Sequence, residues 1–128
     1  MKIIVDTCSF LWFIENNPKL SSTALSLIED KGNDILLSFA SIWEMAIKHS
    51  IGKLIFTKAF DNFIREQLDI NSIGISSINF DHIATVATLP LYHRDPFDRM
   101  IIAQAIVEGH PIISSDTVFD DYPIKRLW

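Results

Sequence analysis

The amino-acid sequence predicts a three-layer α/β/α domain with a mostly parallel central sheet of four to five strands. Short apolar runs rich in β-branched residues alternate along the chain with longer runs of helical spacing, and this alternation is typical of parallel sheets covered on both faces. No linker, repeat or low-complexity stretch interrupts it, and a length of 128 residues suits one domain. We therefore expect one α/β domain over residues 1–128.

The first third of the chain is predicted to contain two strands and two helices. The run KIIVD at 2–6 is β-branched and typical of a buried strand. Residues 8–17 follow as a short helix that ends at Asn-Asn-Pro, and residues 21–32 form a helix with a serine cap and a glycine stop. The apolar run DILLS at 34–38 is the second strand.

The middle of the chain alternates in the same way. Residues 40–52 form a predicted helix with Ser41 as its N-terminal cap. Residues 57–68 form another, with Thr57 at the cap and apolar residues at helical spacing. The run INSIGIS at 70–76 gives a third strand, which returns the chain to the sheet.

The last third contributes two helices and two strands. Residues 79–89 form a helix that ends before a proline. Residues 95–108 form the most strongly predicted helix, which a glycine ends. The run PIISSD at 111–116 is the fourth strand, and IKRLW at 124–128 is a short terminal one.

Composition narrows the class of protein. Hydrophobic residues make up 48% and charged residues 21%, a normal balance for a globular chain. The apolar runs are too short to span a bilayer and the N-terminus does not resemble a signal peptide. The single cysteine, Cys8, suits a reducing compartment, so we expect a cytoplasmic protein. A formal net charge of −5 argues against a non-specific nucleic-acid coat but is compatible with a nuclease that binds cations.

Four acidic side chains are predicted to meet at one edge of the sheet. Asp6 and Asp116 each end a predicted strand, and the carboxyl ends of parallel strands lie at the same edge. Asp98 lies near the start of the helix that leads to the later strand, and Asp95 opens the same helix. Glu44 lies near the start of the helix that follows the second strand.

Each acid could also serve a purely structural purpose. Asp95 followed by a proline is a near-ideal helix cap, and Asp98 at the third helical position could take part in the capping. Asp6 could cap the helix that follows it. Glu44 stands four residues before Lys48, an order that favours a surface ion pair, but its apolar neighbours predict partial burial.

A cluster of carboxylates favours a hard divalent cation. Oxygen ligands with open water positions suit Mg²⁺ or Mn²⁺, which bind phosphates, polarise a phosphodiester and generate hydroxide. The sequence has neither a His/Cys cluster at zinc spacing nor a glycine-rich phosphate loop. It therefore supports neither zinc nor a nucleotide cofactor.

The chain resembles a known family from about residue 2 to its end. VDTCSFLW, ASIWEMAIKHSIGKL, HRDPFDRMIIAQAIVEG and ISSDTVFDDYPIKRLW are similar, in order and spacing, to motifs of the PIN-domain ribonucleases. The greatest similarity is to VapC-like toxins of bacterial type II toxin–antitoxin systems. The resemblance implies a PIN-like nuclease domain, a Mg²⁺- or Mn²⁺-dependent endoribonuclease, a cognate antitoxin protein as partner, and a homodimer.

The resemblance also assigns roles to the acids by position. Asp6, Asp98 and Asp116 are the implied metal ligands, the last often through a water molecule. Glu44 completes the four-acid catalytic site and is a possible fourth ligand. Asp95 is structural or supports the ligands indirectly.

One position departs from the family, and three hydroxyls near the acids have two interpretations each. Cys8 stands where the relatives commonly carry Ser, Asn or His; we favour a packed small residue over a weak positioning role. Thr7, Ser115 and Thr117 could orient carboxylates or waters, or they could simply form hydrogen bonds within turns.

Basic and aromatic residues near the acids could contact RNA. His93 and Arg94 could meet phosphate oxygens, or they could be a solvated loop pair. Three aromatic side chains could stack on bases or receive an antitoxin peptide, although we expect core packing for at least two of them: Trp12, Phe13 and Trp43.

The sequence therefore predicts a metal-dependent endoribonuclease toxin that hydrolyses RNA phosphodiester bonds with a metal-activated water. One alternative is a metal-binding but catalytically silent module that acts through its antitoxin. Another is a phosphatase with Asp6 as its nucleophile. The haloacid-dehalogenase pattern requires a second Asp two residues later, where this chain has Cys8.

Overall fold

Five short parallel strands form the centre of the computed structural model, which describes all 128 residues. They lie in the order β3-β2-β1-β4-β5. Their bounds are Lys2–Val5 for β1, Asp34–Ser38 for β2, Gly74–Ser76 for β3, Ile112–Ile113 for β4 and Arg126–Leu127 for β5. Val5 in the central strand pairs with Leu37 of β2 on one side and with Ile113 of β4 on the other. The predicted parallel sheet is confirmed.

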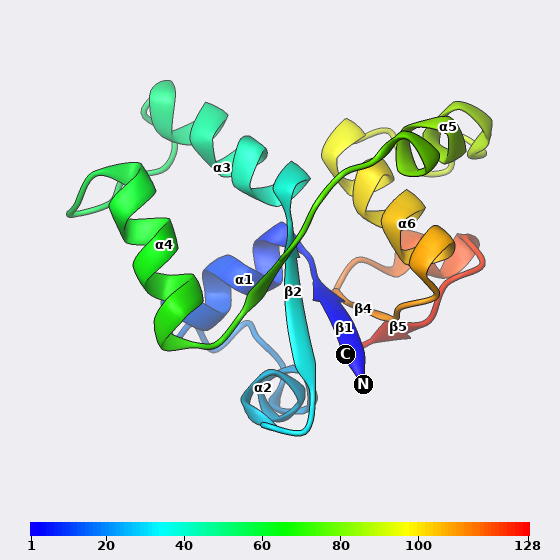
Figure 1. Ribbon diagram of the computed structural model, residues 1–128. Helices are drawn as coiled ribbons and strands as arrows, with labels where there is room; N and C mark the ends of the chain where they lie inside the picture. The colour runs from blue at the N-terminus through cyan, green and yellow to red at the C-terminus, as the bar shows by residue number, and fades with distance from the viewer.

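Helices cover both faces of this sheet (Figure 1). Their bounds are Thr7–Ile14 for α1, Ser22–Glu29 for α2, Phe39–Ser50 for α3, Phe60–Ile70 for α4, Phe80–Thr88 for α5, Pro96–Glu108 for α6 and, for the 3₁₀ helix η1, Thr117–Asp121. None of these seven helices combines the length and apolar character that crossing a bilayer requires. The predicted helices are all present, whereas η1 was not predicted.

Two predicted helix caps are wrong. Ser38, the last residue of β2, caps α3 by accepting a hydrogen bond from the backbone N–H of Ala40 at 3.0 Å. Ser41 lies inside the helix and is buried. The helix α4 begins only at Phe60 and has no side-chain cap, so Thr57 does not start it. In each case the local pattern placed the right helix but tertiary packing chose its first residue.

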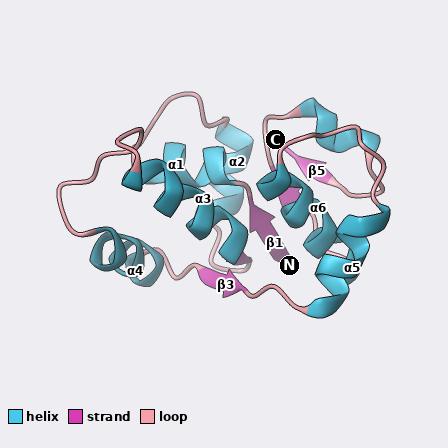
Figure 2. Cartoon of the chain, turned by 90° about the horizontal axis from the view of Figure 1, so that it is seen from above, coloured by secondary structure: helices cyan, strands magenta, loops and turns pink.

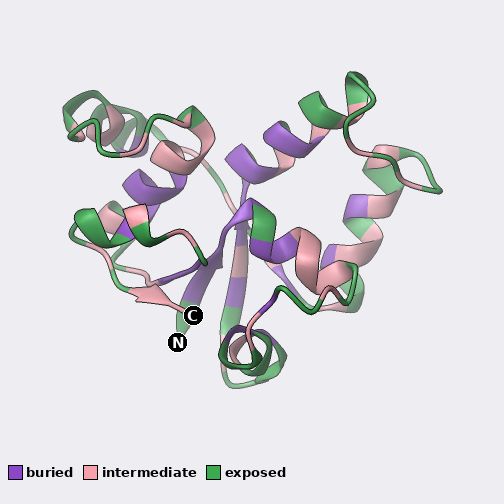
Figure 3. Cartoon of the chain, turned by 180° about the vertical axis from the view of Figure 1, so that it is seen from behind, coloured by how far each residue is buried: buried purple, intermediate pink, exposed green.

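The two faces of the sheet carry separate hydrophobic cores. Side chains alternate along a strand, so Ile3 and Val5 point to one face and Ile4 points to the other. The first core packs residues of α1, α2, α3 and α4, and the second packs residues of α6, η1 and Tyr122. Figure 3 shows that burial is concentrated in β1 and β2 and in the parts of α3 and α6 nearest the sheet. Packing in the two cores fixes the helices against the faces of the sheet, and so fixes where each helix begins at its carboxyl edge.

At the carboxyl edge of the sheet, three chain segments turn directly from a strand into a helix. Asp6 follows β1 and caps α1, accepting from the backbone N–H of Ser9 at 2.8 Å. Ser38 makes the turn from β2 into α3. Asp116 follows β4 and caps η1, accepting from the backbone N–H of Val118 at 3.0 Å. Viewed from above, α3 and α6 lie over this edge (Figure 2). The predicted acids therefore belong to the elements that meet there.

Candidate active site

Two carboxylates and one imidazole converge at the carboxyl edge of the sheet. His93 lies in the loop before α6, Asp98 in the first turn of α6, and Asp116 at the start of η1. The His93 Nε2 lies 2.9 Å from Asp116 Oδ2 and 3.0 Å from Asp98 Oδ2. Each residue offers one ligand atom, and these atoms all lie within 4.8 Å of one another. The other oxygen of Asp116 caps η1, so Oδ2 is the one directed at the cluster.

Asp6 lies beside this cluster but is held by its own helix. Its side chain is buried, with 6% of the residue exposed, and its Oδ1 accepts the Ser9 N–H. Burial raises the pKa of the Asp6 carboxyl, hydrogen bonding with Ser114 and Ser9 opposes the rise, and the charge of Asp116 adds to it. Asp6 is not one of the three residues with ligand atoms within 4.8 Å of each other. It is therefore a neighbour of the cluster that shares its electrostatic field.

Asp98 shows most directly that the acids meet. Burial, and after it the negative charges of Asp95, Asp6, Glu44 and Asp116, together raise the pKa of its carboxyl to about 8. Every acid expected at this edge therefore acts on one side chain. Like charges held together in a partly buried place resist ionisation unless a cation compensates them. The carboxylates of this site therefore outnumber the positively charged side chains beside them.

Glu44 is the one acid whose charge is already compensated within the protein. It lies on α3 with 7% exposed, and its Oε2 accepts a hydrogen bond from Lys48 Nζ at 2.8 Å. That hydrogen bond raises the pKa of the Lys48 ammonium group. Both structural expectations for Glu44 are confirmed, since it is buried and it pairs with Lys48. This pairing makes it the least available of the acids for binding a cation.

Asp95 caps α6 as expected. Its Oδ1 accepts hydrogen bonds from the backbone N–H groups of Phe97 at 2.8 Å and Asp98 at 3.2 Å, and Pro96 is the first helical residue. The capping is confirmed, and it fixes the turn of helix that carries Asp98. The charge of Asp95 also acts on Asp98, so the residue influences the cluster without reaching into it.

The residues flanking the acids have more varied positions than the sequence suggested. Thr7 is buried and donates its hydroxyl to Ser41 Oγ at 2.8 Å, which ties α1 to α3. Ser115, Thr117 and Arg94 are exposed, and their side chains form no hydrogen bond with the acids. The structure therefore brings none of these four into contact with a carboxylate.

Near Asp6 the structure corrects the prediction for Cys8 and adds Ser114, a residue that was not predicted from the sequence. Cys8 is exposed, so our preference for a packed residue is wrong. Partial desolvation and the negative charges of Asp6, Asp98 and Glu44 raise the pKa of its thiol, while Lys48 lowers it, which places Cys8 at the mouth of the acid site. Ser114 is fully buried, and its Oγ accepts the backbone N–H of Asp116 at 3.0 Å. Its position directly after the buried strand β4 was the available signal.

Of the three aromatic candidates, two pack on the core and one does not. Trp12 and Phe13 lie against the first core, and the Trp12 ring is 6.0 Å from that of Trp128. Trp43 is 63% exposed, and its ring meets that of Phe97 edge-on at 5.3 Å. Trp43 directly precedes Glu44 on α3, and the half-buried Phe97 directly precedes Asp98 on α6.

Arg99 anchors the loop that carries His93, a role that sequence reasoning missed. Its guanidinium donates to four backbone carbonyls, those of Val86, Leu89, Pro90 and His93, at 3.0 to 3.3 Å. The hydroxyl of Tyr122 reinforces the loop by accepting the His93 N–H at 2.8 Å and donating to the Pro90 carbonyl at 2.6 Å. These hydrogen bonds fix the C-terminal end of α5 against the loop that leads into α6.

Replacing Arg99 by Ala should lower the free energy of unfolding by roughly 2–4 kcal/mol, because several carbonyls lose a charged donor. Arg99→Lys should recover little of this, since one ammonium group cannot reproduce the planar fork. Urea unfolding measures the effect. Arg94→Ala is the matched control, because Arg94 is exposed and its side chain forms no hydrogen bond. Equal stability of the Arg99→Ala and Arg94→Ala proteins would contradict the anchoring role.

The metal-free protein should lose stability as the pH rises from about 4 to about 8. The Asp98 carboxyl ionises in the unfolded chain near its ordinary pKa of 3.8, whereas in the folded protein it holds its proton up to about 8. Between these values the folded state binds more protons than the unfolded state, so stability falls with increasing pH. Melting temperatures measured in EDTA should fall less steeply with pH for Asp98→Asn, while the exposed helix acid Asp81 can be changed to Asn as a control. Identical slopes for all three proteins would argue against the raised pKa.

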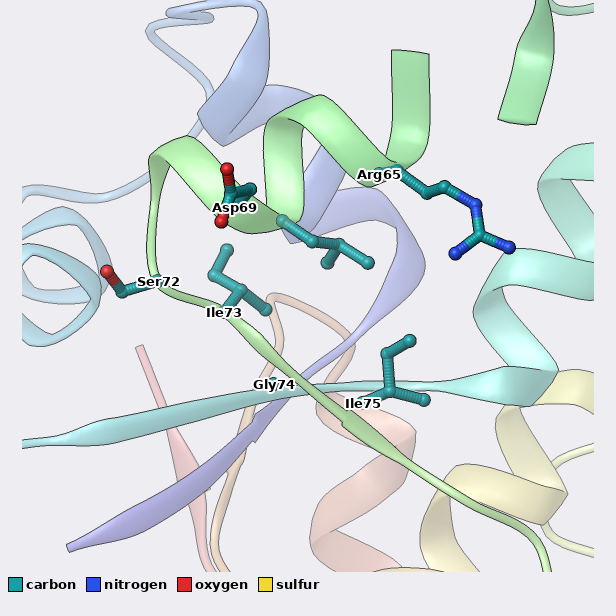
Figure 4. A pocket seen from close by; sticks show the side chains of 7 residues that line it. Arg65, Asp69, Ser72, Ile73, Gly74 and Ile75 are labelled. Atoms are coloured by element: carbon teal, nitrogen blue, oxygen red, sulfur yellow. The ribbon is translucent and has the colours of Figure 1, made fainter. Parts of the chain in front are cut away.

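A surface hollow lies away from the acids, at the edge strand of the sheet. Figure 4 shows Arg65 and Asp69 on α4 beside Gly74 and Ile75 of β3. Its lining has no cluster of nucleophilic or metal-binding side chains, and it shares no residue with the acid site. The chemistry of the protein is therefore concentrated at the carboxyl edge.

Comparison with known proteins gives one family match and several structural ones. The model of the PIN domain matches residues 3–125. Ribonuclease VapC16 of Mycobacterium tuberculosis is 32% identical over 73 residues, which are 54% of this chain and 50% of that protein. The chain thus matches about half the length of this curated relative.

Solved structures with the same fold cover nearly the whole chain. VapBC2 from Rickettsia felis, bound to a DNA fragment from its promoter, matches with a TM-score of 0.71 at 18% identity over 98% of this chain and 97% of that one. VapBC-1 from nontypeable Haemophilus influenzae matches with a TM-score of 0.64 at 15% identity over 98% and 96%. FitAcB from Neisseria gonorrhoeae gives 0.64 at 18% identity over 97% and 95%. At these identities the likeness concerns the fold.

Proposed function

The chain belongs to the PIN domain family, and from that premise we propose that it is a metal-dependent endoribonuclease and the toxin of a type II toxin–antitoxin pair. The proposal treats residues 1–128 as one nuclease domain. The observation that carries it is the meeting of Asp98 and Asp116 with Asp6 close enough to act on Asp98, whose pKa burial and the neighbouring acids raise to about 8. The similarity to Ribonuclease VapC16 supports RNA as the substrate, which would place the activity in the cytoplasm.

The donor set fits a hard divalent cation. Carboxylate oxygens are the ligands that Mg²⁺ and Mn²⁺ prefer, and His93 is the one side chain that pairs with Asp98 and Asp116, with neither Lys nor Arg beside them. In the proposal Asp98 and Asp116 hold the ion with Asp6 beside them, and Glu44 contributes charge from its pair with Lys48. The bound ion would polarise the phosphodiester and make a water molecule more acidic.

Helix N-termini near the acids could bind an RNA phosphate, and hydrogen bonds within the chain keep the acids in position. The helices α1, α3 and α6 begin at Thr7, Phe39 and Pro96. The first two follow β1 and β2 directly at the carboxyl edge of the sheet, and the first turn of α6 carries Asp98. A helix N-terminus carries partial positive charge and free N–H groups, which favour phosphate oxygens. Capping by Asp6 and Asp95 fixes two of these helix starts, and Ser114 keeps the segment of Asp116 in place.

The partners of the proposal are an antitoxin protein and a second copy of the chain. The resemblance to VapC-like toxins implies the first, and the shared fold with the solved VapBC2 and VapBC-1 structures supports it. Exposed apolar side chains on α3 and α5 support a protein partner that covers these helices. They are Phe39, Trp43 and Ile47 on α3, and Phe80 and Ile83 on α5. A homodimer is expected from the family resemblance.

The test is cleavage of total bacterial RNA by the purified protein in the presence of Mg²⁺ or Mn²⁺. We expect discrete fragments that carry a 5′-phosphate and a 3′-hydroxyl, which end-labelling distinguishes. Metal binding without RNA turnover would favour the catalytically silent antitoxin-binding module. A trapped aspartyl-phosphate at Asp6 with intact RNA would favour the phosphatase.

A further inference from the structure

We infer that His93 is a positioning residue of the acid site: its Nε2–H group holds the Asp116 carboxylate beside that of Asp98, and the backbone N–H of Asp95 keeps the imidazole in the tautomer that this requires. The inference rests on the proposed function, because it concerns the same acids. It adds a residue whose role the acids alone do not reveal.

The tautomer of His93 follows from its hydrogen bonds. The backbone N–H of Asp95 donates to Nδ1 at 3.2 Å, so Nδ1 carries a lone pair there. The ring proton of the neutral imidazole then sits on Nε2. Nε2 donates to Asp116 Oδ2 at 2.9 Å, and Asp98 Oδ2 lies 3.0 Å from the same nitrogen. One N–H group therefore stands between two acids of separate segments.

The ring is held from several sides, so it can act as a fixed support. The His93 side chain is 13% exposed, and its ring lies 5.6 Å from the buried ring of Phe119. Its backbone N–H donates to the Tyr122 hydroxyl at 2.8 Å, and its carbonyl accepts from Arg99 at 3.1 Å. The loop therefore cannot swing the imidazole away without breaking the network that joins α5 to α6.

The two acids need such a donor because nothing else in the protein compensates them at close range. Asp98 belongs to α6 and Asp116 caps η1, and the two repel one another whenever Asp98 is ionised, which is part of why the pKa of Asp98 is raised. The nearest ammonium group that acts on this region, Lys48, is engaged with Glu44 at 2.8 Å. An N–H group between the carboxylates offsets part of the repulsion and keeps an oxygen of each acid within 4.8 Å of the other. The site is thereby organised before a cation enters.

Two other roles for His93 make different predictions. As a metal ligand it would need a lone pair on Nε2, which places the proton on Nδ1 against the N–H of Asp95. As a packing residue it would act only through its ring on Phe119. The positioning role depends on the N–H group and on neither of these.

The experiment measures Mn²⁺ binding to the metal-free protein by calorimetry and electron paramagnetic resonance. His93→Phe keeps a ring against Phe119 but removes the donor, and we expect Mn²⁺ affinity about 10- to 100-fold weaker, as for other residues that support metal ligands. His93→Gln keeps an N–H at similar reach, and we expect an affinity between those of wild type and His93→Phe. His110→Gln is the control, because the His110 side chain forms no hydrogen bond and lies outside the site. Its affinity should equal that of wild type.

Several results would overturn the inference. Wild-type affinity in His93→Phe would show that packing suffices, and equally weak binding by His93→Gln and His93→Phe would show that the donor does not matter. A nitrogen coupling to bound Mn²⁺ that His93→Gln removes would make His93 a ligand instead. These results leave the proposed function standing if the wild type binds Mn²⁺ and cleaves RNA. Absence of Mn²⁺ binding by the wild type would overturn both.

Discussion

Asp98→Asn should reduce the rate of RNA cleavage about a thousandfold, which corresponds to about 4 kcal/mol of lost transition-state stabilisation. Asn has nearly the shape of Asp, but it lacks the ionisable carboxyl on which the other acids of this site act. The measurement is the initial rate of cleavage of one RNA fragment at saturating Mg²⁺. The folded structure should survive, because Asn, like the protonated Asp98 carboxyl, carries no charge for the four neighbouring acids to repel.

The matched control for this prediction is Asp81→Asn. Asp81 and Asp98 both lie in the first turn of a helix, but Asp81 is exposed on α5 and away from the acids. Its substitution should leave the rate unchanged. Comparable rates for Asp98→Asn and wild type would remove Asp98 from the catalytic site.

Two substitutions of Asp6 should separate the helix cap that its carboxylate forms from the catalytic role that we propose for it. Asp6→Ala should abolish cleavage and also lower the free energy of unfolding by about 1 kcal/mol, since α1 loses its cap. Asp6→Asn keeps a side-chain oxygen for the Ser9 N–H, so it should retain the stability and lose about 100- to 1000-fold in rate, in line with several kcal/mol of lost electrostatic stabilisation. Cleavage rates and urea unfolding of both variants test this. An active Asp6→Asn protein would reduce Asp6 to a helix cap.

The fold was predictable because its signals are local and repeated. Apolar runs of strand length alternate with helical spacing, and the parallel sheet follows from that alternation. The topology alone then predicts Asp6 and Asp116 at one edge, beyond the carboxyl ends of two parallel strands. Both strands end earlier than predicted, because β1 stops at Val5 and β4 at Ile113, so each Asp is a helix cap rather than the last residue of a strand. Asp95 was recognisable as a cap because an aspartate directly before a proline is a strong signal for the start of a helix. The PIN-domain resemblance agrees with the family match over residues 3–125.

The detail of the site was less predictable, because it depends on contacts between distant segments. The sequence does not show that Arg99 binds carbonyls up to 13 residues away, or that Tyr122 closes the same loop. The sequence left His93 open between a phosphate contact and a solvated pair with Arg94, and neither interpretation predicted that it lies between two acids. Cys8 looked like a packed residue, yet the first helix turns its side chain outward toward the acid site. In each case a side chain's direction decided the role.

The central claim is that these acids hold a divalent cation with which the protein cleaves RNA. The most direct test is to remove the metal: the purified protein is dialysed against EDTA and assayed on total bacterial RNA with no metal, with Mg²⁺ and with Mn²⁺. We expect no cleavage without metal and the same discrete fragments once either ion is restored. Discrete cleavage that continues undiminished in EDTA would contradict it.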